Sequence, residues 1–233
     1  MPRNRFEKLR SCLHINDNSL MKLRYHPNYD KLFKVRPYID ALKKIFAKTE
    51  PEEFSSVDEI MIPFKGHSSL KPYIKNKPHK WGIKLFVRAG VSGIIYEFDV
   101  YVGKYTVMPI DNKELGMSGN VVVQLTEYLP KHKKFKICTD NFFTSLQLVQ
   151  HLKSVGILCI GTVRSNRLKG LKLLDDKELK RDERGAYDFA TEVSSNIVAV
   201  KWFDNKSVTV LCIFRSRASN FSEKMVSERK KLY

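Results

Sequence analysis

Cysteine and long apolar runs are both scarce in this 233-residue sequence. The four cysteines, Cys12, Cys138, Cys159 and Cys212, are widely separated and form no C-x-x-C pair, which argues against a disulfide scaffold and against a zinc site. No stretch approaches the about 18 apolar residues of a membrane span, and the N-terminus lacks the apolar segment of a secretory signal. We therefore expect a soluble intracellular chain in which three of the cysteines pack as small hydrophobic residues.

Acidic residues are also in the minority. Aspartate and glutamate number 25 against 42 lysines and arginines, so the formal net charge is +17. This imbalance predicts a polyanionic partner, with nucleic acid as the leading candidate, although a merely basic protein is the alternative. The sequence contains no glycine-rich phosphate loop that ends in Lys-Ser/Thr and no G-x-S-x-G turn, so nucleotide-binding and serine-hydrolase functions have no support.

An acidic residue follows a short apolar strand in the middle of the chain. The strand ends at Asp140, and the pattern then predicts a helix over Ser145–Val155, with Gly156 just after its last turn. A carboxylate at the carboxyl end of a strand, next to the N-terminus of a helix, is placed for metal or phosphate chemistry. A strand-end or helix-capping role is the alternative for Asp140.

A second acid lies 82 positions upstream, within a strand predicted over Phe54–Ile62. Strand alternation places Asp58 on the same face as Ile60 and Ile62, so we expect an acid in a buried row, where it requires a cation. Two carboxylates on neighbouring strands can hold a pair of Mg²⁺ ions about 3.5–4 Å apart for in-line attack on a phosphodiester. A solvent-facing strand position is the alternative for Asp58.

Both acids belong to an ordered series of short motifs. The series comprises Val57–Glu59, Pro63–Gly66, Tyr73, Lys77–Pro78, Trp81–Lys84, Tyr101–Lys104, Leu115–Gly116, Thr139–Ser145, Gly161–Arg167 and Lys201–Trp202. In order and spacing, over nearly the whole chain, it resembles the transposase domain of the piggyBac family. The resemblance implies an α/β fold with an RNase H-like (DDE/DDD transposase) core, Mg²⁺ as cofactor and DNA as partner.

By the same resemblance, Asp58 and Asp140 are the first two acids of a catalytic Asp-Asp-Asp set and bind the metal. The family's third aspartate, in a Gly-Gly-Val-Asp context, and its Cys/His-rich zinc module do not occur within these 233 residues. Mg²⁺ binds weakly through few carboxylates. We therefore expect a core truncated before the third acid, with weak metal binding and little or no strand transfer.

A basic connection, Leu70–Lys80, is a candidate for DNA contact. Its lysines can meet phosphates, and Tyr73 and Trp81 offer stacking surface; a proline-rigidified, solvated hairpin connection is the equal alternative. With the resemblance, the predicted DNA-binding residues are Lys65, Lys71, Tyr73, Lys75, Lys77, Lys80, Arg164 and Arg167.

Changes in periodicity, taken together with the resemblance, predict three segments. Residues 1–50 form a helical segment whose apolar stripes, at Phe6–Leu13 and Val35–Phe46, should make core contacts. Residues 51–165 form the RNase H-like core, and residues 166–233 form a basic, β-rich insertion-like segment with a charged tail. The predicted core strands and helix are Phe54–Ile62, Gly82–Ala89, Ile94–Val102, a helix near Asn120–Leu129, and Ile157–Val163; the insertion strands are Ala186–Val193, Asn196–Phe203 and Ser207–Phe214.

The leading hypothesis is thus a transposase-derived domain related to cut-and-paste DNA transposases, with nuclear location implied by the resemblance and homodimer formation left open. A non-catalytic, domesticated DNA-binding or protein-interaction module is the alternative. A third hypothesis is a general nucleic-acid binder without a metal site, whose binding would depend on salt but not on Mg²⁺.

Overall fold

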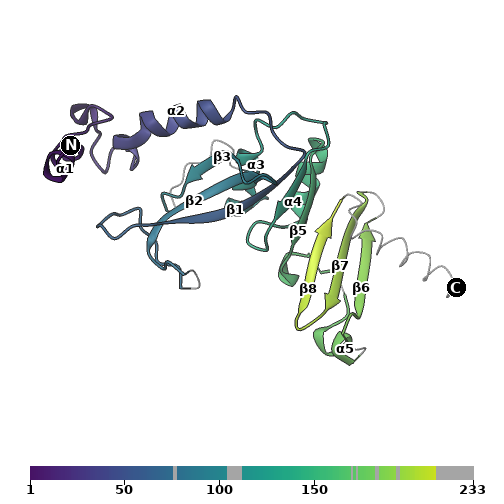
Figure 1. Cartoon of the computed structure of the whole chain (residues 1–233). Helices are drawn as coiled ribbons and strands as arrows, with labels where there is room; N and C mark the ends of the chain where they lie inside the picture. The colour runs from purple at the N-terminus through teal and green to yellow at the C-terminus, as the bar shows by residue number, and fades with distance from the viewer. Residues whose placement is uncertain are drawn as a thin grey trace. The chain divides into compact units, whose positions relative to one another are not determined.

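A computed structural model describes residues 1–75, 78–103, 112–168, 170–171, 173–181, 184–192 and 195–213 (Figure 1). The chain divides into two compact units. Unit 1 contains Met1–Glu50, Met61–Lys84 and Val100–Thr106, and unit 2 contains Pro51–Ile60, Leu85–Asp99 and Val107–Tyr233. The segment boundaries expected after residues 50 and 165 stay predictions, and the expected charged tail lies outside the described residues.

Unit 1 is rich in short helices. They are α1 (Arg3–Ser11), η1 (Asn18–Leu20), η2 (Phe33–Val35) and α2 (Arg36–Phe46). Pro37 lies in the first turn of α2, where its missing N–H costs no hydrogen bond. The expectation that the apolar stripes make core contacts is wrong for α1, which buries no residue, whereas α2 buries Ile39 and half-buries Leu42 and Phe46. Helical periodicity identifies an apolar face but does not show what covers it.

Eight strands form one mixed sheet, in the order β3-β2-β1-β4-β5-β8-β7-β6. Their bounds are β1 Phe54–Pro63, β2 Gly82–Gly90, β3 Ile95–Val100, β4 Lys136–Thr139, β5 Leu158–Thr162, β6 Tyr187–Glu192, β7 Ile197–Phe203 and β8 Ser207–Cys212. Strands β1, β4 and β5 run parallel, whereas β5, β8, β7 and β6 pair antiparallel. The strand that carries Asp58 and the strand that leads into Asp140 are therefore neighbours, as the two-carboxylate hypothesis requires, and β8, β7 and β6 extend the sheet (Figure 1).

Helix α4 (Leu146–Ser154) makes the crossover between the parallel strands β4 and β5. The Ser145 hydroxyl accepts a hydrogen bond from the Leu148 amide at its start, and Gly156, at φ +74°, follows its last turn. Leu148, Val149 and Leu152 are buried on this helix. The remaining helical elements of unit 2 are α3 (Gly116–Leu125), η3 (Ser165–Arg167) and α5 (Asp176–Arg181).

Helix α3 begins four residues before the position expected for it. Gly116 and Gly119 lie inside its first turns. The buried Arg88 side chain donates from Nε to the Leu125 carbonyl at 2.7 Å, which satisfies one of the last carbonyls of the helix. No helix in the described part of the chain is long and apolar enough to cross a membrane.

The central strands bury one face and leave the other accessible. The covered row includes Ser55 and Val57 on β1, Ile137 on β4 and Cys159 on β5. The predicted burial of the Asp58 row is wrong, because Ile60 and Ile62 on that row are 39% and 46% exposed. Alternation defines two rows per strand, but not which row is covered.

The same register explains the cysteines. Cys159 lies in the buried row, and its burial raises the pKa of the thiol to about 12. Cys138 lies opposite Ser56 in the accessible row and is exposed, while Cys212 is half-buried. The expectation that three cysteines pack as buried hydrophobic residues is therefore correct in full only for Cys159.

A candidate metal centre and nucleic-acid interface

Parallel pairing of β1 with β4 brings the two predicted acids together in unit 2. Val57 on β1 pairs with Thr139 on β4, and the next residues in the sequence are Asp58 and Asp140, respectively. One ligand oxygen from each of Asp58, Glu59 and Asp140 can be chosen so that all three lie within 4.8 Å of one another. Three carboxylates are thus gathered at the point where the β1–β4 pairing ends.

Backbone amides orient both aspartates. Asp58 Oδ1 accepts a hydrogen bond from the Glu59 amide at 2.7 Å, and Asp140 Oδ1 accepts one from the Phe142 amide at 2.9 Å. Both aspartates are exposed, so Asp58 takes the solvent-facing position. Asp140 does not cap the following helix, because Ser145 does so. Its carboxylate instead closes an Asx turn, which fixes the side chain at the end of β4.

Buried threonines hold the backbone behind Asp140. The Thr144 hydroxyl donates to the Asp140 carbonyl at 2.7 Å and lies 2.8 Å from the Thr139 hydroxyl. Gly161 on β5 is packed against the same group, since a Cβ there would lie 2.3 Å from Thr144 Oγ1 and 2.6 Å from the Thr139 carbonyl oxygen. A side chain at position 161 would therefore push against the turn that carries Asp140.

Aromatic packing anchors this turn to the core. The fully buried Phe143 ring meets the Phe86 ring edge-on at a centroid distance of 5.8 Å and the Phe142 ring at 5.0 Å. Such aromatic pairs stabilise a fold beyond the area that they bury. The two aspartates of the acid cluster are thus exposed and Glu59 is half-buried, while buried side chains support the turn after Asp140.

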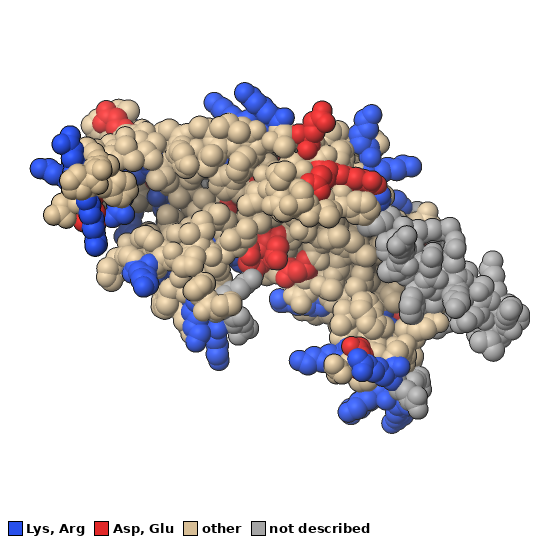
Figure 2. Space-filling model, in the orientation of Figure 1, with Lys and Arg blue, Asp and Glu red and all other residues tan. Residues whose placement is uncertain are grey.

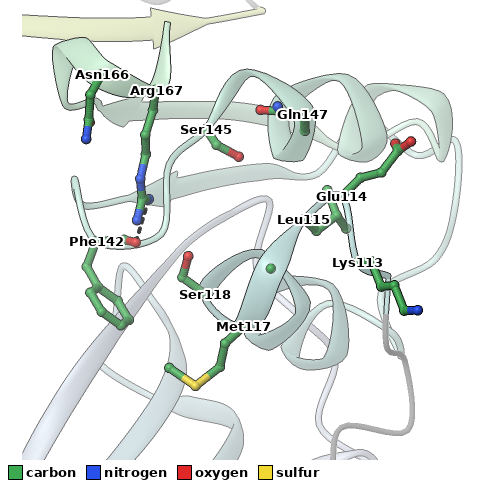
Figure 3. A pocket seen from close by; sticks show the side chains of 11 residues that line it. Lys113, Glu114, Leu115, Met117, Ser118, Phe142, Ser145, Gln147, Asn166 and Arg167 are labelled. Atoms are coloured by element: carbon green, nitrogen blue, oxygen red, sulfur yellow. Dashed lines mark hydrogen bonds between the residues drawn. The ribbon is translucent and has the colours of Figure 1, made fainter. Parts of the chain in front are cut away.

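Two arginines after β5 reach the same turn. Arg164 donates from Nε and Nη2 to Asn141 Oδ1, each at 3.3 Å, and remains exposed. Arg167 is half-buried, and its Nη1 donates to the Phe142 and Thr144 carbonyls at 2.7 and 3.1 Å (Figure 3). Both arginines were predicted to contact DNA, which stays a prediction. The structure adds a role that the sequence did not indicate, which is to brace the turn after Asp140.

A pocket of about 530 Å³ lies beside this turn, and the sequence analysis did not predict it. Figure 3 shows Phe142 and Arg167 on one side of it and the start of α3 on another. The lining residues are Lys113–Ser118, Phe142, Ser145, Gln147, Asn166 and Arg167. The pocket therefore mixes cationic, polar and apolar side chains within a few residues of the acid cluster.

The donor set has the chemistry of a hard-cation site. Carboxylate oxygens are the ligands that Mg²⁺, Ca²⁺ and Mn²⁺ prefer, and three carboxylates this close repel one another unless a cation lies between them. Glu59 is the member that the sequence analysis missed, because strict alternation assigned it to the face opposite Asp58. Its position next to Asp58 in the chain was the available signal.

The predicted DNA-contact lysines belong mainly to unit 1. Lys65, Lys75 and Lys80 are exposed, and Lys77 lies outside the described residues. Lys71 donates from Nζ to the Gly66 carbonyl at 2.9 Å and also lies over the Trp81 ring, 5.3 Å from its centroid. Figure 2 shows lysine and arginine side chains at several places on the face drawn, most of whose surface is formed by uncharged residues.

Tyr73 and Trp81 lie side by side in this region. They form an isolated antiparallel bridge, and their ring centroids are 5.0 Å apart with the planes at 54°. Tyr73 is 51% and Trp81 is 53% exposed. The segment has one feature of each alternative. Tyr73 and Trp81 pair across an antiparallel bridge, as in a hairpin, and their rings are accessible for stacking.

Comparisons of the sequence and of the fold with known proteins all find transposases or proteins derived from them. The sequence model of the family described as Transposase IS4 matches residues 1–232. The chain is 35% identical over 213 residues to human PiggyBac transposable element-derived protein 3 and 32% identical over 215 residues to human PiggyBac transposable element-derived protein 2. These alignments cover 90% and 89% of this chain, but 35% and 34% of the two relatives. The chain thus spans about a third of the length of these curated relatives.

The fold comparison gives the same result. The structure is similar to one solved by cryo-electron microscopy as a piggyBac transposase synaptic complex with hairpin DNA, with a TM-score of 0.76 and 25% sequence identity. The match covers 93% of this chain and 44% of the solved chain. The shared architecture confirms the predicted RNase H-like α/β core.

Proposed function

Because this chain belongs to the piggyBac-type transposase IS4 family, we propose that it is a DNA-binding, transposase-derived domain that holds divalent metal ions at Asp58, Glu59 and Asp140. The observation that carries the proposal is the gathering of three carboxylates where the pairing of β1 and β4 ends. The DNA part is supported by the net charge of +17 and by the DNA named with the solved neighbour.

The residues present fit a magnesium or manganese ion. All three candidate ligands are oxygen donors, and the two aspartates are exposed, so hydrated ions can reach them. When bound, such an ion supplies Lewis-acid chemistry for substitution at a phosphodiester. The protein's own contribution is orientation, because the Glu59 and Phe142 amides fix one oxygen of each aspartate.

The turn that carries Asp140 supplies rigidity. Arg167 and Thr144 donate hydrogen bonds to its backbone carbonyls, and the buried Phe143 side chain fixes the turn to the core. A ligand set that is held in place before binding loses less conformational freedom when the ion arrives. Arg164 and Arg167 also place positive charge beside the acids, which favours approach of a phosphate backbone to an otherwise acidic site.

Metal binding by defined variants tests the first half of the proposal. Mn²⁺ affinity is measured by electron paramagnetic resonance for the unaltered chain and for Asp58→Asn, Glu59→Gln and Asp140→Asn. Each substitution removes one carboxylate from the cluster, and we expect at least about a tenfold loss of affinity. Glu127→Gln is the matched control, because Glu127 is exposed in unit 2 and is not a member of the cluster. Equal Mn²⁺ binding by all five proteins contradicts the site.

A nicking assay tests the chemistry separately. A DNA duplex with piggyBac-type ends is incubated with this chain and Mg²⁺ or Mn²⁺, and the products are compared with those of Asp140→Asn. Nicking that is lost in Asp140→Asn makes Asp58 and Asp140 a working catalytic pair. Metal and DNA binding without nicking supports the second candidate function, a non-catalytic DNA-binding module, which the exposed lysines and aromatics of unit 1 favour.

We extend the proposal to DNA contacts, location and assembly. The DNA-contact set is Lys65, Lys71, Tyr73, Lys75, Lys77, Lys80, Arg164 and Arg167. Neutralising each contacting cation should lower the slope of log affinity against log salt by about 0.9 for a duplex. Nuclear location and homodimer formation rest on the family alone. Microscopy of a tagged chain and light scattering of the purified protein test them.

A further inference from the structure

We propose that Tyr73 and Trp81 form a stacking site for unpaired nucleobases of DNA. The proposal rests on the DNA-binding function above and narrows it to one substrate feature, a base face that is not already covered by neighbouring bases in a duplex. It is argued entirely within unit 1, from the exposure of the two rings, their mutual geometry, the lysine beside them and the charge of the surrounding segment.

Tyr73 and Trp81 expose a large aromatic area to water, which is energetically unfavourable. Tyr73 and Trp81 each leave about half of their surface in contact with solvent, at 51% and 53%. A large aromatic side chain gains most when its faces are covered, and adjacent exposed aromatics mark surfaces that bind a partner. The rings offer an apolar platform in a segment that also exposes Lys65, Lys75 and Lys80.

The backbone fixes the platform. Tyr73 and Trp81 face each other across an antiparallel bridge, and the Ile74 amide donates to the Lys80 carbonyl at 2.8 Å. Cross-strand partners project from the same side of a strand pair, so both rings are presented together. The fold therefore already orders the two side chains, so that ligand binding removes little of their conformational entropy.

A lysine is held beside the platform. The Lys71 ammonium lies 5.3 Å from the Trp81 ring centroid and donates to the Gly66 carbonyl at 2.9 Å. This contact keeps a positive charge over one face of the Trp81 ring and leaves the rest of the aromatic surface for a base. A nucleotide whose base stacks on the rings would bring its phosphate within reach of that charge, which is the combination found in sites for single-stranded nucleic acid.

The surrounding segment carries positive charges and no negative charge. Between Met61 and Lys84 the sequence contains six lysines and no aspartate or glutamate. No acid of this segment therefore repels a phosphate backbone. Since a base inside a duplex is stacked on both faces, the exposed rings can meet a base face only where the base is unpaired or terminal. An unpaired strand is the ligand that uses both the rings and the lysines.

The chain supplies its own fluorescent reporter. It has two tryptophans, Trp81 and Trp202, and Trp202 lies on β7 in unit 2. In a Trp202→Phe protein the emission comes from Trp81 alone. This protein is titrated with single-stranded oligothymidylate, with an abasic strand of equal length, and with a blunt duplex. We expect oligothymidylate to quench Trp81 and to bind about 5- to 100-fold more tightly than the abasic strand.

Ring substitutions complete the test. Trp81→Leu and Tyr73→Ala should each weaken oligothymidylate binding by about 5- to 100-fold and leave duplex binding within about twofold, while Trp81→Phe retains most of the affinity. Tyr25→Ala is the matched control, because Tyr25 is 85% exposed in the same unit and lies outside the lysine segment. If Trp81→Leu does not fold, quenching of Trp81 in the Trp202→Phe protein decides the question.

The outcomes separate this inference from the proposed function. Equal loss of single-strand and duplex binding in the ring variants, or equal affinity for oligothymidylate and the abasic strand, overturns the stacking site and leaves DNA binding intact. Absence of binding to every DNA at low salt overturns both. Unchanged affinity in Trp81→Leu, with a lowered melting temperature, identifies the pair as a structural clasp of the hairpin and overturns the stacking site.

Discussion

The two units of this chain place their functional candidates in different ways. In unit 2 the acids stand at the end of a strand pairing and are supported by buried threonine and phenylalanine side chains. In unit 1 the candidates are exposed lysines and aromatics, and Leu32 and Ile39 are the only buried apolar side chains among the described residues of that unit. Metal chemistry needs fixed ligand positions, whereas contact with a nucleic-acid backbone tolerates mobile side chains on an accessible surface.

Thiol reactivity should show the largest difference between the units. Cys12 in unit 1 is exposed, whereas burial raises the pKa of Cys159 in unit 2 to about 12. At pH 8 a thiol with that pKa is about one ten-thousandth thiolate, and the thiolate is the reactive form. We expect a disulfide reagent to modify Cys12 at least about a thousandfold faster than Cys159, as measured by mass spectrometry of timed samples.

A denaturant series provides the control for this comparison. Cys159 should become reactive only as the protein unfolds, while the reactivity of Cys12 should change little. Modification of both cysteines at the same rate in native buffer would show that the β4–β5 core opens as readily as the surface of unit 1.

Truncation of a core aromatic should be the largest effect on stability. Phe143→Ala removes a fully buried ring that packs against Phe86 and Phe142, so we expect a loss of about 3–5 kcal/mol in the free energy of unfolding. Tyr25→Ala, at an exposed position of unit 1, should change it by less than about 0.5 kcal/mol. Urea unfolding followed by far-ultraviolet circular dichroism measures both. Equal effects would refute the contrast in burial.

The two arginines after β5 divide the roles of support and binding. Arg167→Gln removes hydrogen bonds from Nη1 to two carbonyls and should destabilise unit 2 by about 1–3 kcal/mol. Arg164→Gln loses the same charge at an exposed position and should cost less than about 1 kcal/mol. Thermal unfolding ranks the variants. A more damaging Arg164→Gln would show that the brace at Asn141, not the one at Phe142, holds the turn.

The smallest expected effect concerns the start of α2. Hydrogen bonds from Arg36 hold the pKa of Asp30 below its usual value. A lowered pKa in the folded state gives stability that is present above the unfolded pKa, near 3.9, and is lost as pH falls through the folded pKa. Because the pair is partly exposed, we expect less than about 1 kcal/mol.

Hydrogen exchange of the α2 amides reads this effect locally. Protection at pH 6 should exceed protection at pH 3 after correction for the intrinsic exchange rates. Asp30→Asn should remove most of that difference, and Asp40→Asn on the same helix should leave it. A pH dependence that survives in Asp30→Asn would assign it to another group.

The regular core of the fold was predictable from the sequence. Strand alternation and turn residues located the strands within a few residues, and the Ser145 cap and Gly156 marked both ends of α4. The two-carboxylate hypothesis placed Asp58 and Asp140 on neighbouring strands, and the pairing of β1 with β4 confirms this. These features depend on local sequence rules or on the order of motifs, and both can be read from the amino-acid sequence alone.

The errors concern what covers each surface. The stripe over Phe6–Leu13 was assigned to a core, yet Phe6, Leu9 and Leu13 are 51%, 55% and 70% exposed. Asp58 was assigned to a buried row, and Glu59 was left out of the acid cluster. Burial and convergence of side chains depend on tertiary neighbours, which periodicity does not report. The pocket beside α3 was missed for the same reason, because its lining comes from distant parts of the chain.

The pairing of β1 with β4 also has a consequence for synthesis on the ribosome. Phe54 pairs with Lys136, so one edge of β1 gains its partner only after another 82 residues. At about 5–20 residues per second, that interval is about 4–16 s. During it, β2 can cover one edge of β1, while the other presents unpaired backbone groups to any strand nearby. The strand that positions Asp58 is thus the one most exposed to mispairing while the chain is being made.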